Sequence, residues 1–215
     1  MGRNNQINRS VRRSTKKVIY LACEGGTGST EATYIKKLCE KYDCSMVWIY
    51  KKSEPNPVVL AEYAIEFSGK QEKRGKAEIW IVFDNDLPNN VQQAYQNVTN
   101  YNNSLIKKKK NFMPVNIAFN SPSVETFGLL CCKQTKISTN KKVNQSKLRH
   151  LMPKYSHDKT PNEGPYFDFY TVESGYDFAI KRAKNWQVSL YDTDTPEHKA
   201  NPFAGIYKLT ESIKE

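Results

Sequence analysis

The stretch AEIWIVFDND, residues 77–86, decides the fold class of this chain. Residues 77–83 are mostly apolar, with isoleucine, valine and aromatic side chains on successive positions, which predicts a strand that is buried on both faces. The apolar run ends at Asp84, and Asp86 follows two positions later. A strand of this kind is typical of a parallel sheet with helices on each side, so we expect an α/β protein.

Outward from this stretch, strands and helices alternate along the chain. Further strands are predicted over residues 17–23, 45–50 and 114–119. The apolar spacing predicts helices over residues 30–42, 57–67 and 91–106. We also expect a helix that opens at Ser121, with Ser121 as its cap and Pro122 at its first position. This order predicts a small parallel sheet of about four strands, joined by right-handed crossovers.

The two ends of the chain differ from this core. Residues 1–16 are polar and basic, which predicts a flexible tail. Residues 17–132 form the expected α/β core. We predict that residues 133–215 form a basic loop and a mainly helical extension that packs on the core. The extension is expected to contain an amphipathic helix over 172–186 and a final helix over 203–213.

Composition limits the classes of function. The chain has 33 Lys and Arg against 22 Asp and Glu, a net charge of +11, which favours a polyanionic partner such as nucleic acid. A basic protein without such a partner is the plainer alternative. The 5 cysteines form no CxxC pair, so their spacing does not favour zinc. No signal peptide or membrane-length apolar run is visible, and we expect a cytoplasmic protein with reduced thiols and no membrane association.

Acidic residues follow the predicted strands. Ligands of an open parallel sheet bind beyond the carboxyl ends of its strands, so residues just after each strand are candidates for a site. These residues are Glu24, Asp84, Asp86 and, at the start of the next helix, Glu125. Oxygen ligands of this kind suit Mg²⁺ or Mn²⁺. Each acid alone has a plainer interpretation, as a turn residue or a helix-start carboxylate, but together they predict a metal site.

A glycine-rich loop follows the first strand. Gly25, Gly26 and Gly28 invite comparison with phosphate-binding loops, although no lysine follows Gly28 and the Rossmann spacing fails. Backbone N–H groups of this loop are a candidate phosphate contact at a helix N-terminus. We expect Glu31 to help cap the first turn of that helix.

A basic region comes directly after the Glu125 helix. We predict that it contacts nucleic acid through phosphate groups. Its members are Lys133, Lys136, Lys141, Lys142, Lys147 and Arg149.

Several motifs, in order, resemble those of the RloB-like proteins, a Toprim group tied to bacterial antiphage systems. They are CEG at 23–25, TE at 30–31, IWIVFDND at 79–86 and NSPSVETFGLL at 120–130. The resemblance implies a Toprim fold with an acidic Mg²⁺ site. Glu24 then corresponds to the general acid/base, and Asp84 and Asp86 to the metal-binding pair, while Glu125 matches a later acidic position. An ATPase partner is implied as well. The loop after Glu24 is two residues longer than usual, and Asn85 stands where the family more often has a charged residue.

These expectations combine into one hypothesis. The chain is expected to be a Mg²⁺- or Mn²⁺-dependent Toprim nuclease that cleaves phosphodiester bonds of RNA, such as tRNA, or DNA as the effector of an antiphage system. Its catalytic residues are Glu24, Asp84 and Asp86, and its metal ligands are these three with Glu125. The alternatives are a non-catalytic subunit that binds nucleic acid or an ATPase, and a primase-like nucleotidyltransferase. Formation of a homodimer is left open.

Overall fold

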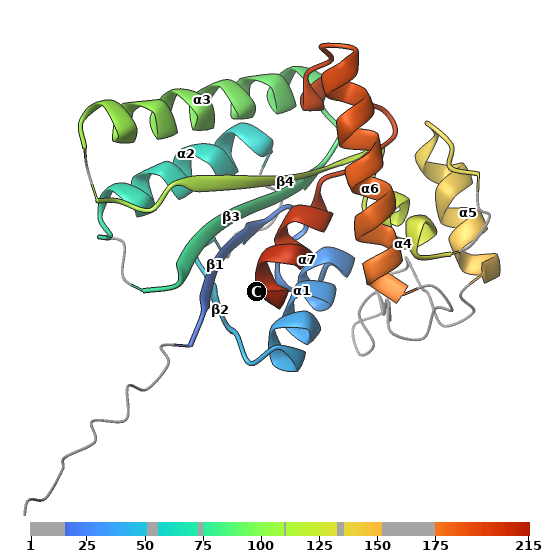
Figure 1. Ribbon diagram of the computed structural model, residues 1–215, viewed down its shortest axis with the longest axis horizontal. Helices are drawn as coiled ribbons and strands as arrows, with labels where there is room; N and C mark the ends of the chain where they lie inside the picture. Colours follow the sequence, from blue (N-terminus) through green and yellow to red (C-terminus); the bar gives the residue numbers. More distant parts are fainter. Residues whose placement is uncertain (1–15, 51–55, 73–74, 110, 133–135, 152–174) are drawn as a thin grey trace, which may run out of the picture.

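The computed structural model describes residues 16–50, 56–72, 75–109, 111–132, 136–151 and 175–215. Its centre is a five-stranded sheet in the order β2-β1-β3-β4-β5 (Figure 1). Four strands, β1 (Val18–Cys23), β2 (Ser45–Trp48), β3 (Ala77–Asp84) and β4 (Val115–Ser121), run parallel, and the short β5 (Phe203–Ala204) pairs antiparallel with β4. The mostly parallel, helix-flanked sheet confirms the predicted Toprim-like α/β fold.

Helices follow the strands as the alternation predicted. The first three are α1 (Thr30–Lys41), α2 (Pro57–Gly69) and α3 (Pro88–Lys107). The later ones are α4 (Glu125–Cys131), α5 (Lys141–Leu151), α6 (Gly175–Asp192) and α7 (Ile206–Lys214). Within the described ranges, no helix is both long and apolar enough to cross a membrane.

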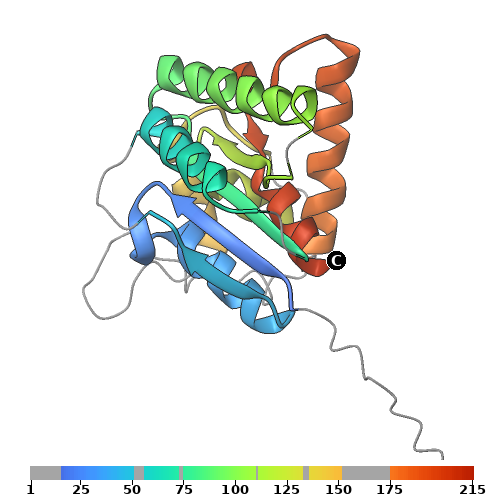
Figure 2. The ribbon, with the colours of Figure 1, turned by 90° about the vertical axis from the view of Figure 1, so that its left-hand side faces the viewer.

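The helices form a layer on each face of the sheet. Figure 2 shows α2 and α3 above the sheet and α1 below it. Strand β3 serves both layers: Ile79 and Ile81 pack in the core beneath α2 and α3, whereas Trp80 and Val82 pack in the core that contains α1 and α7. This two-sided burial explains why the strand reads as a nearly continuous apolar run.

Two boundaries near the C-terminal edge of the sheet differ from the prediction. Ser121 does not cap a helix, because β4 continues through it and it pairs with Phe203 of β5; α4 begins only at Glu125. The final helix begins at Ile206 rather than at 203. Between β5 and α7, a Cβ at Gly205 would lie 2.4 Å from the Phe119 carbonyl oxygen, so only glycine allows this close approach to β4.

The predicted basic loop contains a helix. Residues 141–151 form α5, whose buried residues are Asn144 and Leu148, and this sparse apolar pattern explains why periodicity missed it. Asn144 orders the preceding turn, since its Oδ1 accepts a hydrogen bond from Ser138 N (2.9 Å) and its Nδ2 donates to Ser138 O (2.8 Å). The predicted tail, except for residue 16, and residues 152–174 lie outside the described part of the chain.

Candidate metal and nucleic-acid site

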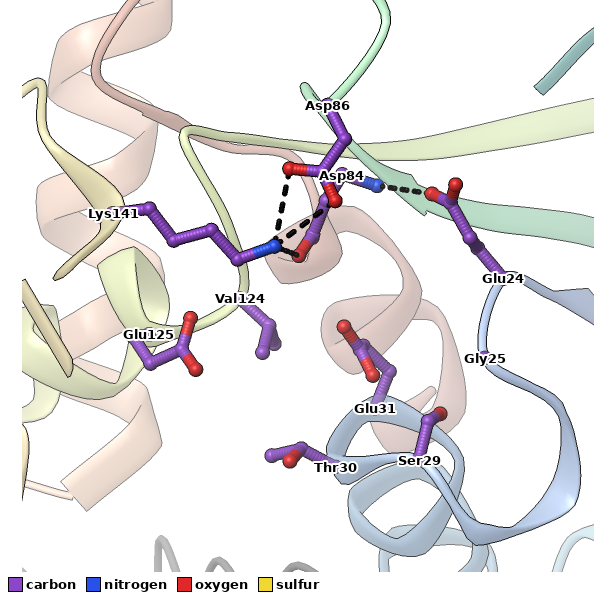
Figure 3. Close-up of a pocket in the computed structure, with 10 residues that line it drawn as sticks. All are labelled: Glu24, Gly25, Ser29, Thr30, Glu31, Asp84, Asp86, Val124, Glu125 and Lys141. Carbon is purple, nitrogen blue, oxygen red and sulfur yellow. Dashed lines mark hydrogen bonds and ion pairs between the residues drawn. The ribbon is translucent and has the colours of Figure 1, made fainter. Parts of the chain in front are cut away.

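A cavity of about 220 Å³ opens at the carboxyl ends of β1 and β3 (Figure 3). The parallel register pairs Cys23 with Val82, so Glu24 and Asp84 come to the same edge of the sheet. The start of α1, the start of α4 and the first residue of α5 complete the walls. The lining residues are Glu24, Gly25, Ser29, Thr30, Glu31, Asp84, Asp86, Val124, Glu125 and Lys141. The predicted acidic residues are therefore brought together.

The Asp84–Asp86 pair faces one cation, the ammonium group of Lys141. Lys141 Nζ lies 3.1 Å and 3.0 Å from the two carboxylate oxygens of Asp86 and 3.6 Å from Oδ2 of Asp84. Asp84 is buried, and its Oδ1 has no hydrogen-bond partner. Asn85, between the two aspartates, donates from Nδ2 to Ser121 Oγ of β4 (3.1 Å).

Glu24 is held beside Asp84 through the backbone. Its Oε2 accepts a hydrogen bond from Asp84 N (3.1 Å), and its own N–H donates to Val82 O (2.9 Å). Burial raises the pKa of Glu24, while the Asp84 N–H opposes that shift. The carboxyl group is thus fixed in position and holds its proton more readily than an exposed glutamate.

Glu31 is a site residue that the sequence reasoning assigned only to helix capping. Ser29 is the cap of α1, since its Oγ accepts from Ala32 N (3.2 Å), and the Glu31 carboxylate projects into the cavity toward Asp84 (Figure 3). Burial, reinforced by the charge of Glu125, raises the pKa of Glu31 to about 7. Burial and then the charge of Glu31 raise the pKa of Asp84 well above its ordinary value. The signal that pointed to it was its place in the TE motif, at the start of a helix that faces the strand ends.

Glu125 lies in the cavity wall with its carboxylate already bound by the protein. It is 1% exposed, Ser123 Oγ donates to its Oε2, and Gln145 Nε2 donates to its Oε1 at 3.3 Å. Its negative charge still acts on Glu31 and Lys141. Glu125 therefore contributes to the electric field of the cavity, and its role as a metal ligand stays a prediction.

The predicted basic residues are divided by the structure. Of the described members, Lys141 alone lines the cavity; burial alone would lower its pKa, but the charges of Asp84 and Asp86 outweigh burial and raise it. Lys142 and Arg149 are exposed on α5. Lys136 is exposed ahead of α5, and its carbonyl accepts from Lys147 Nζ (2.7 Å). Lys133 lies outside the described residues.

The glycine loop meets the site at one residue. Gly25 lines the cavity, whereas Gly26 and Gly28 do not. Gly25 and Gly26 have positive φ angles of 82° and 71°, which suit glycine. A Cβ on Gly25 would lie 3.0 Å from Ser29 Cβ, so glycine at this position allows the turn to pack closely against the start of α1.

The donor set fits a hard divalent cation. Carboxylate oxygens are the ligands that Mg²⁺ and Mn²⁺ prefer, and Asp84 Oδ1 is buried without a partner. Across the described ranges, no three His, Cys, Asp or Glu side chains are arranged to hold a metal ion. The ammonium group of Lys141 meets the aspartate pair instead.

Comparison with known protein families identifies a match. A family model described as RloB-like protein matches residues 19–213. The chain belongs to the RloB-like family. The match spans β1 to α7 and includes every residue of the RloB-like protein that lines the acidic cavity. No curated protein and no solved structure matched.

Proposed function

We propose that this RloB-like protein is a divalent-metal-dependent nuclease that cleaves phosphodiester bonds. The observation that carries the proposal is Asp84, a buried aspartate with a partnerless oxygen, at the strand edge where an α/β sheet binds its ligands. Carboxylates with a raised pKa destabilise the folded protein when they are charged. Groups with such shifted pKa values cluster at functional sites.

Asp84 and Asp86 would hold the metal, with Glu31 at the opposite wall of the same cavity. When bound, Mg²⁺ or Mn²⁺ neutralises charge on a phosphodiester and lowers the pKa of a water molecule. Asn85, between the two aspartates, is tied to β4 by its bond to Ser121.

Glu24 would hold or accept a proton at its carboxyl group. A general acid or base works best when its pKa lies close to the working pH, and burial moves the pKa of Glu24 in that direction. Its bond to Asp84 N places the carboxyl beside the aspartate pair rather than in contact with Lys141.

The substrate would be a polyanion. The protein carries a net charge of +11, and the exposed Lys142 and Arg149 lie on α5, the helix that begins at the cavity. Basic side chains beside a nuclease site supply salt-dependent phosphate affinity. We propose the setting that the resemblance to RloB-like proteins implies, in which RNA such as tRNA, or DNA, is cleaved in the cytoplasm as part of an antiphage system with an ATPase partner.

Cleavage of mixed RNA and DNA pools in Mg²⁺ tests the proposal. Asp84→Asn is expected to reduce cleavage by at least about 100-fold, because it removes a charged ligand while keeping the shape of the side chain. The matched control is Glu66→Gln, the same acid-to-amide change on the exposed face of α2, which should cleave like the wild type.

Equal cleavage by the wild type and Asp84→Asn would refute the assignment. Absence of cleavage by the wild type, with nucleic-acid binding retained, would favour the non-catalytic subunit. Product formation that requires nucleoside triphosphates would favour a nucleotidyltransferase.

A further inference from the structure

Lys141 reaches the aspartate pair from a part of the chain that is remote in sequence. It is the first residue of α5, and its side chain extends across the cavity to Asp84 and Asp86 (Figure 3). Its ammonium bonds both oxygens of Asp86 and lies 3.6 Å from one oxygen of Asp84. This is the position from which a cation would neutralise the pair.

Helix α5 does not depend on this contact for its placement. Leu148 is fully buried in the core shared with α4 and α6, and Asn144 is fully buried and bonded to Ser138. Gln145 supplies a separate bond to Glu125. The helix therefore stays docked when the Lys141 ammonium moves, and the flexible four-carbon stem of lysine allows that movement.

We propose that Lys141 is a mobile cation of the site: it neutralises Asp84 and Asp86 in the absence of a divalent metal, and it transfers its ammonium to a phosphate oxygen of the nucleic acid when the metal binds. The inference rests on the proposed function and adds to it a ligand for the substrate phosphate. A lysine bonded to both aspartates and a divalent cation bound to the same oxygens would repel each other at contact distance, so the two cannot occupy the pair together.

The size of the cavity supports the second half of this exchange. In a cavity of about 220 Å³, a phosphate group has little room to lie far from either the aspartates or Lys141. Ammonium groups bind phosphate as point charges, and Lys141 lines the same cavity as the two aspartates.

Metal affinity separates this exchange from a fixed ion pair. Mn²⁺ binding is measured by calorimetry on the full chain for wild type, Lys141→Met, Lys141→Arg and Lys181→Met. Lys141→Met should bind Mn²⁺ about 5- to 30-fold more tightly, because the metal no longer displaces a competing charge pair. Lys141→Arg should bind like the wild type or more weakly. Lys181→Met removes an exposed lysine of α6 and should change the affinity less than about 2-fold.

Nucleic-acid affinity tests the other half without relying on cleavage. Anisotropy titrations use labelled single-stranded RNA and DNA in Ca²⁺. Lys141→Met should weaken binding by about 10-fold despite its better metal affinity, with partial rescue in Lys141→Arg, since each lost phosphate contact is worth about that much. Lys181→Met again serves as the control.

The outcomes are separable from those of the proposed function. Unchanged or weaker Mn²⁺ binding by Lys141→Met would overturn the exchange while leaving the metal site standing. Unchanged nucleic-acid affinity in Lys141→Met would overturn the phosphate contact. Absence of Mn²⁺ binding by both wild type and Lys141→Met would overturn the exchange together with the metal site itself.

Discussion

Strands β1 and β3 carry charged side chains near both of their ends, and the two ends differ in how those charges are matched. At the amino end, Lys17 Nζ lies 2.9 Å from Glu78 Oε1, and Trp80 Nε1 donates to Glu78 Oε2 at 2.8 Å. Burial alone would raise the pKa of Glu78, but hydrogen bonds from Ser212, Trp80 and Lys17 lower it. At the carboxyl end, the pKa values of Glu24, Glu31 and Asp84 are all raised.

The contrast separates a charge with several bonding partners, which stabilises the fold, from carboxylates that we propose bind a ligand. Glu78 has a donor for each oxygen, and its neighbours are Lys17 just before β1, Trp80 of β3 and Ser212 of α7, so the cluster ties the C-terminal helix to the sheet. The acidic cavity has one lysine among five carboxylates in its lining, and a buried aspartate oxygen without a partner. Such an arrangement costs stability unless something positive completes it.

The largest expected effect belongs to Glu24. Glu24→Gln should lower Mg²⁺-dependent cleavage by about 100- to 1,000-fold, because it removes a general acid or base. Its effect on Mn²⁺ affinity should be no more than about 3-fold, since Glu24 bonds the backbone of Asp84 rather than the cation that meets the aspartates. Parallel cleavage and calorimetry experiments measure the two effects. A loss of metal binding as large as the loss of cleavage would make Glu24 a metal ligand instead.

At the opposite end of the sheet, Glu78→Gln should reduce the free energy of unfolding by about 2–4 kcal/mol, because the partly buried ammonium of Lys17 loses its counter-ion and keeps its neutral partner Ser212. Lys17 has a side chain only 10% exposed. Urea denaturation measures the change, and Glu66→Gln, which breaks an exposed pair, should cost less than about 1 kcal/mol. Equal losses in the two variants would show that the amino-end cluster is not a stabilising centre. Metal affinity should stay unchanged in both.

Replacing Glu31 should raise the free energy of unfolding, whereas replacing Glu78 should lower it. The Glu31 pKa of about 7 in the fold exceeds its ordinary value of 4.5, so wild-type stability falls as pH rises from about 4.5 to 7 and the unfolded chain releases the proton first. Below pH 4.5 both states are protonated and no penalty remains. Glu31→Gln should therefore be more stable than the wild type at pH 8 without divalent metal, by about 1–3 kcal/mol, and equally stable at pH 4. Urea denaturation at both values tests this, and a difference independent of pH would contradict it.

The smallest effect is expected at Asn85. Asn85→Ala removes the bond to Ser121 and leaves both aspartates in place, so cleavage should fall by less than about 10-fold and stability by about 1 kcal/mol. Cleavage rates and urea denaturation measure the change. A loss as severe as that expected for Asp84→Asn would place Asn85 among the groups that contact metal or substrate.

The sequence predicted the features that depend on local pattern. The apolar run of β3 and the rule that parallel strands end at one edge were enough to predict that Glu24, Asp84 and Asp86 lie close together. The direction of the Glu31 side chain was harder to predict. An acidic residue in the first turn can cap its own helix or face a neighbouring element, and the placement of α1 in the fold decides between these two roles. The contact of Lys141 with Asp86 spans 55 residues and depends on how α5 docks, for which a helix with few buried residues gives little local signal.

Short or closely packed elements also escaped prediction. Strand β5 has only two residues, and its pairing with Ser121 turned a plausible helix cap into the last residue of β4. Neither spacing nor propensity identifies such a strand, because tertiary contact alone creates it.

The central claim is that the Asp84–Asp86 pair binds a divalent cation in place of the Lys141 ammonium. Crystals grown in Mn²⁺ and measured for anomalous scattering test it most directly. We expect an anomalous peak about 2.1 Å from oxygens of both aspartates, with Lys141 Nζ moved away from them. A saturating Mn²⁺ soak that leaves the Lys141 ion pairs intact and shows no peak at the aspartates would contradict it.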